Sequence, residues 1–291
     1  MAKYDVVVVG GGPGGSMAAK TAAEVGLKTI FFERGRRPGE KNSSGCGLGQ
    51  RWWRDFPEII EKVTKLPSYR RITMCLVNVI DENNNLRMRI STGGSDLDLA
   101  RYTYGGRNRG MDGSSVLRMD LDPMLADMAT EVGAELRTST LITDVIKENG
   151  KVVGVITDKG DKIEAEVVIG ADGAMSTMAR KSGLRNRWKA GVTLVPQLHF
   201  SCSESKLDDV VGDAEWLWFG PFYGTYQVHF RDSFHLGVGN WLRRWDAKPI
   251  DMLKRVLEIP AFQAVVRAIE AKPIEYQAHM LPWMEKPPQT Y

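Results

Sequence analysis

The chain has 291 residues, of which 43% are apolar and 26% are charged, and it contains 30 glycines. This composition is typical of an ordinary globular protein and excludes a disordered, collagen-like or disulfide-stapled chain. Lys and Arg number 39 against 36 Asp and Glu, so no excess of positive charge indicates a nucleic-acid partner. At roughly 150 residues per domain, the length allows one large domain or two intermingled ones.

Residues 4–9 form a short apolar, β-branched run of the kind that is buried on both faces of a parallel sheet. The run ends in the glycine-rich residues 10–15, and residues 16–25 then carry small side chains at helical spacing up to Gly26. Residues 27–32 are a second apolar run. Strand, glycine turn, helix and strand within about 30 residues predict a right-handed βαβ unit.

The glycine turn GGGPGG matches the G-x-G-x-x-G pattern of dinucleotide-binding proteins, in the required place between a strand and a helix. In that pattern Gly10 allows the tight turn, Gly12 lets a pyrophosphate approach the backbone, and Gly15 lets helix and strand pack closely. Glu33 follows the second strand, where a carboxylate accepts hydrogen bonds from a ribose hydroxyl. The alternative is a glycine turn that binds no dinucleotide, but the strand, the helix and the acidic residue all lie at the positions that the pattern requires.

The remaining elements are predicted from periodicity and turn residues. A glycine-rich loop at residues 34–50 is followed by strands at 72–80 and 86–90, a helix at 121–132, hairpin strands at 141–146 and 152–157, and a strand at 165–169. Polar–apolar alternation then predicts antiparallel strands at 192–200, 216–219, 225–230 and 234–238, before helices at 249–258 and 261–271. The chain thus changes from a parallel to an antiparallel character near residue 191.

A second motif distinguishes a flavin from a nicotinamide cofactor. Residues 168–180, VIGADGAMSTMAR, resemble the G-A-D-G-x-x-S-x-x-R segment of the glutathione-reductase-like flavoproteins of the p-hydroxybenzoate hydroxylase class. Arg118, which precedes the helix at 121–132, resembles the flavin-contacting arginine of that class. The resemblance implies FAD as the cofactor and a cationic partner for its pyrophosphate. An ordinary strand turn and a surface arginine are the alternative.

The loop GEKNSSGCG at residues 39–47 narrows the class further. It resembles the G-x-K-N-x-x-G-G loop of electron-transfer-flavoprotein:quinone oxidoreductases and their nitrogen-fixation-associated relatives, and it is similar to the Cys-Gly loop of geranylgeranyl reductases. Both resemblances imply contact between this loop and the flavin. The alternative for Cys46 is a small buried side chain that only fills space in the protein interior. The predicted cofactor-binding residues are Gly10, Gly12, Pro13, Gly14, Gly15, Glu33, Arg34, Lys41, Asn42, Cys46, Gly47, Gly49, Arg118, Ile142, Asp172 and Gly173.

An aromatic segment begins at Trp216 and reads WLWFGP. It resembles the aromatic-Trp-Phe-Pro segment of geranylgeranyl reductases, and it nearly matches the W-x-W-x-I-P signature of flavin-dependent halogenases, with Gly220 in place of Ile. The predicted substrate pocket is lined by Trp216, Trp218, Phe219 and Tyr223. Such an aromatic surface suits an apolar or planar substrate. The alternative is that these side chains form the core of a β-sheet.

The predicted fold is α/β, a glutathione-reductase-like FAD-binding Rossmann domain with an inserted antiparallel β-sheet substrate domain. The FAD-binding domain is expected at residues 1–70 and 106–190, the substrate domain at 71–105 and 191–275, and the start of the return to the FAD-binding domain at 276–291. In the family that the motifs resemble, a later G-D segment completes the flavin site. We therefore expect either a fragment or a second chain that supplies this part.

The resemblance implies an FAD-dependent oxidoreductase that passes electrons from a carrier, an electron-transfer flavoprotein or a ferredoxin-like donor, to a quinone or other apolar acceptor. The alternatives are a C=C reductase like geranylgeranyl reductase, a flavin monooxygenase or halogenase, and a non-catalytic subunit of an electron-transfer complex. No side chain is identified as a catalytic acid or base. Any assignment of a specific substrate would rest on analogy with other proteins of the same fold.

The cysteines and the N-terminus bear on metal binding and location. Cys46, Cys75 and Cys202 show no C-x-x-C or His spacing, so no metal site is predicted and a reducing compartment fits best. No run of about 20 apolar residues and no signal peptide are recognisable. We expect a cytoplasmic protein, with peripheral contact at the inner face of the membrane left open because such contact needs no spanning helix.

Overall fold

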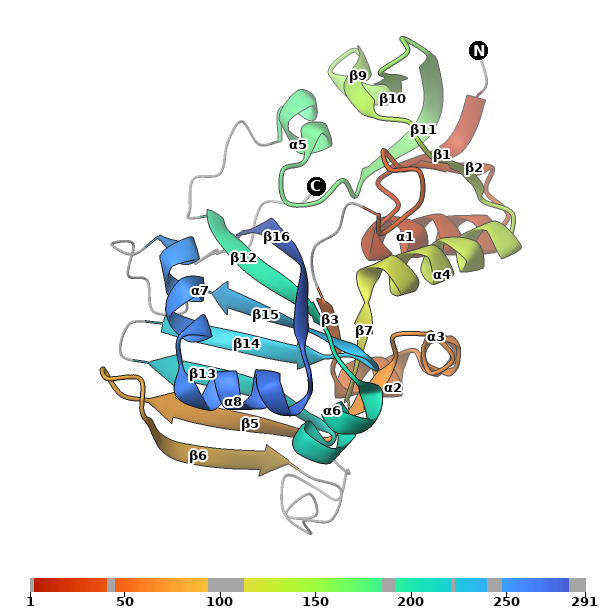
Figure 1. Cartoon of the computed structure of the whole chain (residues 1–291). Helices are drawn as coiled ribbons and strands as arrows, with labels where there is room; N and C mark the ends of the chain where they lie inside the picture. Colours follow the sequence, from red (N-terminus) through yellow and green to blue (C-terminus); the bar gives the residue numbers. More distant parts are fainter. Residues whose placement is uncertain are drawn as a thin grey trace, which may run out of the picture. The chain divides into compact units, whose positions relative to one another are not determined.

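The structure of the protein is a computed structural model that describes residues 3–40, 45–93, 113–184, 192–220, 223–239 and 248–282. The chain divides into two compact units (Figure 1). The first consists of Met1–Asn42, Arg118–Val192 and Met280–Tyr291, and the second of Ser43–Leu117 and Thr193–His279. Each unit is therefore built from segments that lie far apart in the sequence.

The first unit is a six-stranded sheet in the order β8-β2-β1-β11-β10-β9. Its strands are β1 (Lys3–Val9), β2 (Thr29–Phe32), β8 (Glu135–Arg137), β9 (Ile142–Glu148), β10 (Lys151–Thr157) and β11 (Lys162–Gly170), and its helices are α1 (Pro13–Glu24), α4 (Arg118–Glu131) and α5 (Thr177–Ser182). β1 pairs in parallel with β2 and β11, and β2 pairs in parallel with β8. The hairpin of β9 and β10 extends the sheet in the antiparallel sense.

The core of this unit lies on both sides of β1. Val6 and Val8 pack on one side with residues of α1 and α4, which lie side by side in Figure 1. Tyr4, Val7 and Val9 pack on the opposite side with the β9–β10 hairpin. Burial on both faces explains why β1 is an unbroken apolar run rather than an alternating one.

The predicted βαβ unit is confirmed as β1, α1 and β2. The helix begins at Pro13, three residues earlier than predicted, because proline fits the first helical position, where its missing N–H is not needed. The predicted hairpin is also confirmed. Asn149 and Gly150 both have positive φ angles, 48° and 80°, as the tight turn between two antiparallel strands requires.

The second unit contains a seven-stranded sheet in the order β16-β12-β15-β14-β13-β5-β6 and a three-stranded sheet in the order β3-β7-β4. The strands are β3 (Gly45–Leu48), β4 (Arg70–Ile72), β5 (Met74–Ile80), β6 (Leu86–Gly93), β7 (Gly113–Leu117), β12 (Val192–Ser201), β13 (Ala214–Gly220), β14 (Tyr223–His229), β15 (Ser233–Gly239) and β16 (Lys272–Pro282). The helices are α2 (Gln50–Asp55), α3 (Pro57–Val63), α6 (Glu204–Val211), α7 (Pro249–Leu257) and α8 (Pro260–Ala268). The large sheet is mixed rather than purely antiparallel, because β13 pairs in parallel with β5.

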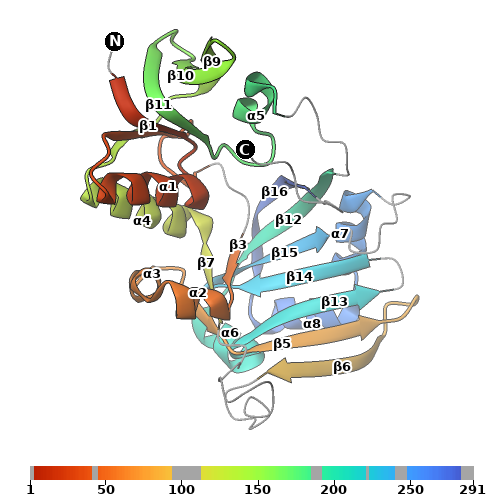
Figure 2. The ribbon, with the colours of Figure 1, turned by 180° about the vertical axis from the view of Figure 1, so that it is seen from behind.

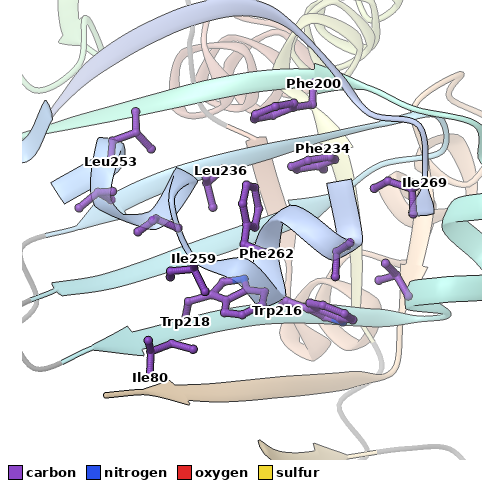
Figure 3. Close-up of a cluster of buried hydrophobic side chains, with 14 of the residues drawn as sticks. Ile80, Phe200, Trp216, Trp218, Phe234, Leu236, Leu253, Ile259, Phe262 and Ile269 are labelled. Carbon is purple, nitrogen blue, oxygen red and sulfur yellow. The ribbon is translucent and has the colours of Figure 1, made fainter. Parts of the chain in front are cut away.

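Helices α7 and α8 cover one face of the large sheet, as comparison of Figures 1 and 2 shows. The apolar core lies between them and the sheet (Figure 3). The rings of Phe200 and Phe234 stack with centroids 4.6 Å apart, and Phe262 of α8 meets the ring of Trp218 edge-on at 6.0 Å. We call the opposite face of this sheet, which points away from α7 and α8, the distal face.

The division into units differs from the predicted domain ranges at one main place. Residues 45–70 and 113–117, which we expected in the FAD-binding domain, lie in the second unit. The physical reason is strand pairing, because β3 and β4 both pair with β7 in the small sheet. The assignment of cofactor binding to one unit and of substrate binding to the other stays a prediction.

A continuous chain of hydrogen bonds runs through the core of the second unit. Trp218 Nε1 donates to Gln227 Oε1 at 3.0 Å, and Gln227 Nε2 lies 2.9 Å from His229 Nε2. His229 Nδ1 lies 2.9 Å from the carbonyl oxygen of Ala214. Since the carbonyl accepts only, the network assigns the proton of a neutral imidazole to Nδ1. Burial lowers the pKa of His229 to about 3, so this histidine stays neutral in the folded protein.

This buried histidine predicts a pH-dependent stability. In the unfolded chain a histidine takes up a proton below about pH 6.5, whereas His229 stays neutral in the folded state until about pH 3. The free energy of unfolding should therefore fall by about 1.4 kcal/mol per pH unit for this group as the pH decreases below 6.5. Urea unfolding between about pH 7 and pH 5 should show a shallower slope for His229→Gln than for the wild type. Equal slopes would contradict the assignment.

Candidate functional site

The glycine turn after β1 packs tightly on one side against the turn after β11. Gly10 has a φ of +113°, and a Cβ at this position would overlap the carbonyl oxygen of Ala171. A Cβ at Gly15 would overlap the carbonyl oxygen of Gly10. The backbone N–H of Ala171 donates to the carbonyl oxygen of Val9 at 2.8 Å. The two motifs recognised separately in the sequence thus form one structure that only glycine permits.

The other side of the turn is open. A Cβ at Gly14 would have no atom within 4 Å, and a Cβ at Gly12 would meet only Nη2 of Arg118, at 3.5 Å. Pro13 occupies the first turn of α1, and no side chain caps this N-terminus. Exposed backbone beside a helix N-terminus is suited to bind an anionic group such as a pyrophosphate.

Arg118 adds a guanidinium group to this open side. Its Nε and Nη2 atoms donate to the carboxylate of Asp122 at 2.5 and 2.7 Å, one turn later in α4. Asp122 is fully buried, so the pair fixes the orientation of the guanidinium. The glycine turn, the helix N-terminus and Arg118 fit the pyrophosphate of a dinucleotide.

Glu33 stands at the end of β2 beside the same turn. Its Oε2 atom accepts from the backbone N–H of Gly11 at 3.1 Å, and its Oε1 atom accepts from that of Gly35 at 2.6 Å. These bonds hold the half-buried carboxylate in place, where the sequence predicts contact with the ribose. Arg34, the next residue, is exposed.

Asp172 has a folding role in the turn after β11. Its carboxylate accepts from the backbone N–H groups of Thr177 and Met178, at 2.6 and 3.1 Å, and from the hydroxyl of Ser176. Ser176 in turn caps α5 by accepting from Ala179 N–H at 2.9 Å. Gly173 supplies the positive φ, 83°, of the turn. The G-A-D-G-x-x-S spacing therefore builds a helix start, and flavin contact at Asp172 stays a prediction.

The other predicted cofactor residues lie in different surroundings. Ile142 of β9 is buried in the core of the first unit. Cys46 and Gly47 belong to β3 of the second unit, paired with Val116 and Ser115 of β7. A Cβ at Gly47 or Gly49 would meet no atom within 4 Å, so the backbone is open there. Lys41 and Asn42 lie outside the described residues.

The structure separates the predicted aromatic pocket into two faces. Trp216 and Trp218 are 4% and 0% exposed and lie in the core beneath α7 and α8 (Figure 3), as the alternative of a sheet core expects. Successive side chains of a strand point to opposite faces, so Phe219 lies on the distal face, where it is half-buried. The side chain of Tyr223 lies outside the described residues.

The distal face also carries polar residues beyond the four predicted pocket residues. Tyr226 lies over Gly237, where a Cβ would overlap its ring, and its hydroxyl donates to Gln197 Oε1 at 2.9 Å. Gln197 Nε2 donates to Gln277 Oε1 at 2.8 Å. Burial raises the pKa of Tyr226 and also that of Glu215 on β13. Strand alternation around the tryptophans was the signal that could have placed Glu215 on this face.

The βαβ unit, the open glycine turn beside Arg118 and the acid at the end of β2 together define a dinucleotide-binding protein with the geometry of a flavoprotein. The chain belongs to the FAD binding domain family, whose model matches residues 3–225. The predictions of FAD as the cofactor and of the α/β flavoprotein fold are thereby confirmed.

Relatives match the chain along almost its whole length. Protein FixC of Salmonella typhi is 30% identical over 294 residues, which are 96% of this chain and 65% of that protein. YdiS of Escherichia coli K12, described as a probable electron transfer flavoprotein-quinone oxidoreductase, is 29% identical over 302 residues with the same two coverages. The chain therefore spans 65% of the length of these two relatives.

Among solved structures, a geranylgeranyl bacteriochlorophyll reductase-like protein from Thermoplasma acidophilum matches with a TM-score of 0.73 and 23% identity. The match covers 97% of this chain and 66% of that one. At this identity the likeness shows the fold. The resemblance to the quinone oxidoreductase group, which the sequence motifs indicated, is thus confirmed, and the likeness to the geranylgeranyl reductase group is confirmed for the fold.

Within the described ranges, no group of three or more His, Cys, Asp or Glu side chains is arranged to hold a metal ion. In the same part of the chain, no helix has both the length and the hydropathy needed to span a bilayer.

Proposed function

We propose that the protein is an FAD-dependent oxidoreductase that accepts electrons from an electron-transfer flavoprotein and passes them to a quinone. The observation that carries this proposal is the match of 96% of the chain to a relative described as a probable electron transfer flavoprotein-quinone oxidoreductase. The open glycine turn beside Arg118 supports it independently, because it supplies a site for the cofactor that such a reaction needs.

In this proposal the residues of the first unit hold FAD. The backbone at Gly12 and Gly14, the N-terminus of α1 and the Arg118 guanidinium bind the pyrophosphate, and the Glu33 carboxylate accepts from the adenosine ribose. Bound FAD supplies the ability to take up and release two electrons. The chain's own residues bind and orient it.

The test follows the flavin spectrum of the FAD-loaded protein. A catalytic amount of electron-transfer flavoprotein, supplied with just enough of its own electron donor to reduce the bound FAD, should bleach the flavin absorbance, and a short-chain quinone should then restore it. Restoration by a polyprenyl alkene instead of a quinone would favour a C=C reductase, and failure of both steps would overturn the proposal. A native mass spectrum of the same sample would show whether a second polypeptide accompanies the chain.

A double variant tests the role of Arg118. Replacing Arg118 alone would remove its guanidinium from the buried Asp122 carboxylate, so both are replaced in Arg118→Met/Asp122→Leu. Charge-assisted hydrogen bonds are worth about 1.5–3 kcal/mol, so the FAD dissociation constant should rise about 10- to 100-fold. The matched control, Lys181→Met/Asp144→Leu, removes a half-exposed ion pair of the same unit and should leave FAD affinity unchanged. Equal affinities of the two double variants, measured by flavin fluorescence titration, would contradict the assignment.

A further inference from the structure

Glu215 is an acid on an otherwise apolar part of the distal face. Trp216 and Trp218 turn toward the helices, and therefore Glu215 and Leu217 point to the distal face. Glu215 lies opposite Cys75 of β5, and Leu217 lies opposite Val77. The carboxyl group thus sits in a sheet surface whose neighbouring positions are mostly uncharged.

A row of side chains crosses the sheet beside Glu215. Ile90 of β6 pairs with Val77, Val77 with Leu217, and Leu217 with Tyr226 of β14. With neighbouring strands about 4.8 Å apart, this row runs for about 14 Å from the edge of the sheet to Tyr226. It provides an apolar surface that ends at a phenol hydroxyl.

The carboxyl group of Glu215 has no cation to stabilise its charged form among the described residues. Burial raises its pKa, and burial is the only cause of the shift. The described titratable groups nearest it on this face are the thiol of Cys75, whose own pKa is raised by burial and by Glu215, and the phenol of Tyr226, whose pKa is also raised by burial. Further across the same face His235 of β15 pairs with His199 of β12, and burial lowers the pKa of both imidazoles, which favours their neutral forms. None of these groups carries positive charge.

We propose that Glu215 delivers a proton to an apolar carbonyl acceptor, a quinone, bound on the distal face beside Leu217 and Tyr226. This inference rests on the proposed function. A carboxyl group among mostly uncharged side chains is suited to this role, since its protonated form can lie against an uncharged ring and still hold a transferable proton. It supplies the acid that sequence motifs did not reveal.

Reduction of a quinone to a quinol consumes two electrons and two protons. The electrons come from reduced flavin, the O–H bond of the Glu215 carboxyl breaks, and an O–H bond forms on a quinone oxygen. Solvent returns a proton to the carboxylate, and the second proton reaches the other oxygen from solvent.

The decisive variant is Glu215→Gln, which keeps the shape but removes the proton. Reoxidation of the reduced, FAD-loaded protein by a short-chain quinone should slow by about 10²- to 10⁴-fold. Reoxidation by ferricyanide, which takes electrons without protons, should keep its wild-type rate. Glu82→Gln makes the same substitution at an exposed turn between β5 and β6 and should alter neither rate. An unchanged quinone rate in Glu215→Gln would overturn the proposal.

The pH profile separates proton delivery from a structural role. In the wild type, quinone reduction should decline as the pH rises through the raised pKa of Glu215, because the carboxyl loses its proton. The decline should be absent in Glu215→Gln and should return in Glu215→Asp. Equal slowing with quinone and ferricyanide, without a changed profile, would show that the side chain only supports the fold.

The infrared spectrum of the flavin-free chain gives a readout that needs no activity. The carbonyl stretch of a protonated carboxylic acid should persist above the pH at which ordinary glutamates ionise, and Glu215→Gln should lack it. If the wild type reoxidises with ferricyanide but not with quinone, the proposed function fails and this step fails with it. If the wild type reduces quinone and Glu215→Gln does so equally well, only the assignment of Glu215 fails.

Discussion

Gly15→Ala is expected to abolish FAD binding and to destabilise the first unit. The Cβ of alanine would overlap the carbonyl oxygen of Gly10, and this oxygen belongs to backbone that is itself packed against Ala171. A main-chain atom cannot rotate away as a flexible side chain can, so the turn between β1 and α1 must open. We expect the free energy of unfolding to fall by at least about 3 kcal/mol, measured by urea unfolding, and no flavin to remain after gel filtration.

Gly14→Ala is the matched control for stability. It makes the same chemical change one residue earlier, where a Cβ would meet no atom within 4 Å and the backbone is already helical. Alanine should therefore leave the free energy of unfolding unchanged or raise it by about 0.5–1 kcal/mol. If the two variants unfolded at the same urea concentration, the close packing of the glycine turn would not explain why residue 15 is a glycine.

Trp218→Ala is the second large expected effect, a loss of about 3–5 kcal/mol in the free energy of unfolding. The indole is fully buried between β13 and α8, meets the ring of Phe262 and donates to Gln227. Truncation leaves a cavity and also removes the partner of a buried amide oxygen. Calorimetric or urea unfolding of the whole chain measures the loss.

Trp218→Phe keeps an aromatic ring and removes the N–H donor. The free energy of unfolding should fall by less than in Trp218→Ala, by about 1–3 kcal/mol. Most of the apolar contact remains, and only the hydrogen-bond donor to Gln227 Oε1 is lost. A residue that lined a substrate pocket would behave differently. Changed substrate affinity with unchanged stability in both variants would place Trp218 in a pocket after all.

The parts of the fold that were predictable from sequence are local. The βαβ unit follows from an apolar run, a glycine turn and a helix within 30 residues, and the Asn149-Gly150 hairpin follows from two adjacent residues that tolerate positive φ. The position of Arg118 beside the glycine turn was indicated by resemblance, and the structure places its guanidinium close to Gly12.

The parts that were not predictable depend on pairing between distant segments. Periodicity shows that β13 has two faces, but it does not tell which face is covered by α7 and α8, and so Trp216 and Trp218 were assigned to a pocket. Alternation places Glu215 on the face opposite the tryptophans, but it does not show that this face is the one without covering helices. The placement of residues 45–70 in the second compact unit was not predictable either, because the pairing of β3 and β4 with β7 leaves no mark in local sequence.

The discontinuity of both units bears on how the chain folds during synthesis. Asn78 of β5 and Leu217 of β13 are 139 residues apart, yet the side-chain amide of one donates to the carbonyl oxygen of the other within a single sheet. Tyr4 and Glu135, joined by a hydrogen bond in the first unit, are 131 residues apart. Loop closure over such distances is slow. The hairpin of β5 and β6 therefore leaves the ribosome long before its neighbour β13, with an unpaired edge that invites aggregation or chaperone binding until β13 has emerged as well.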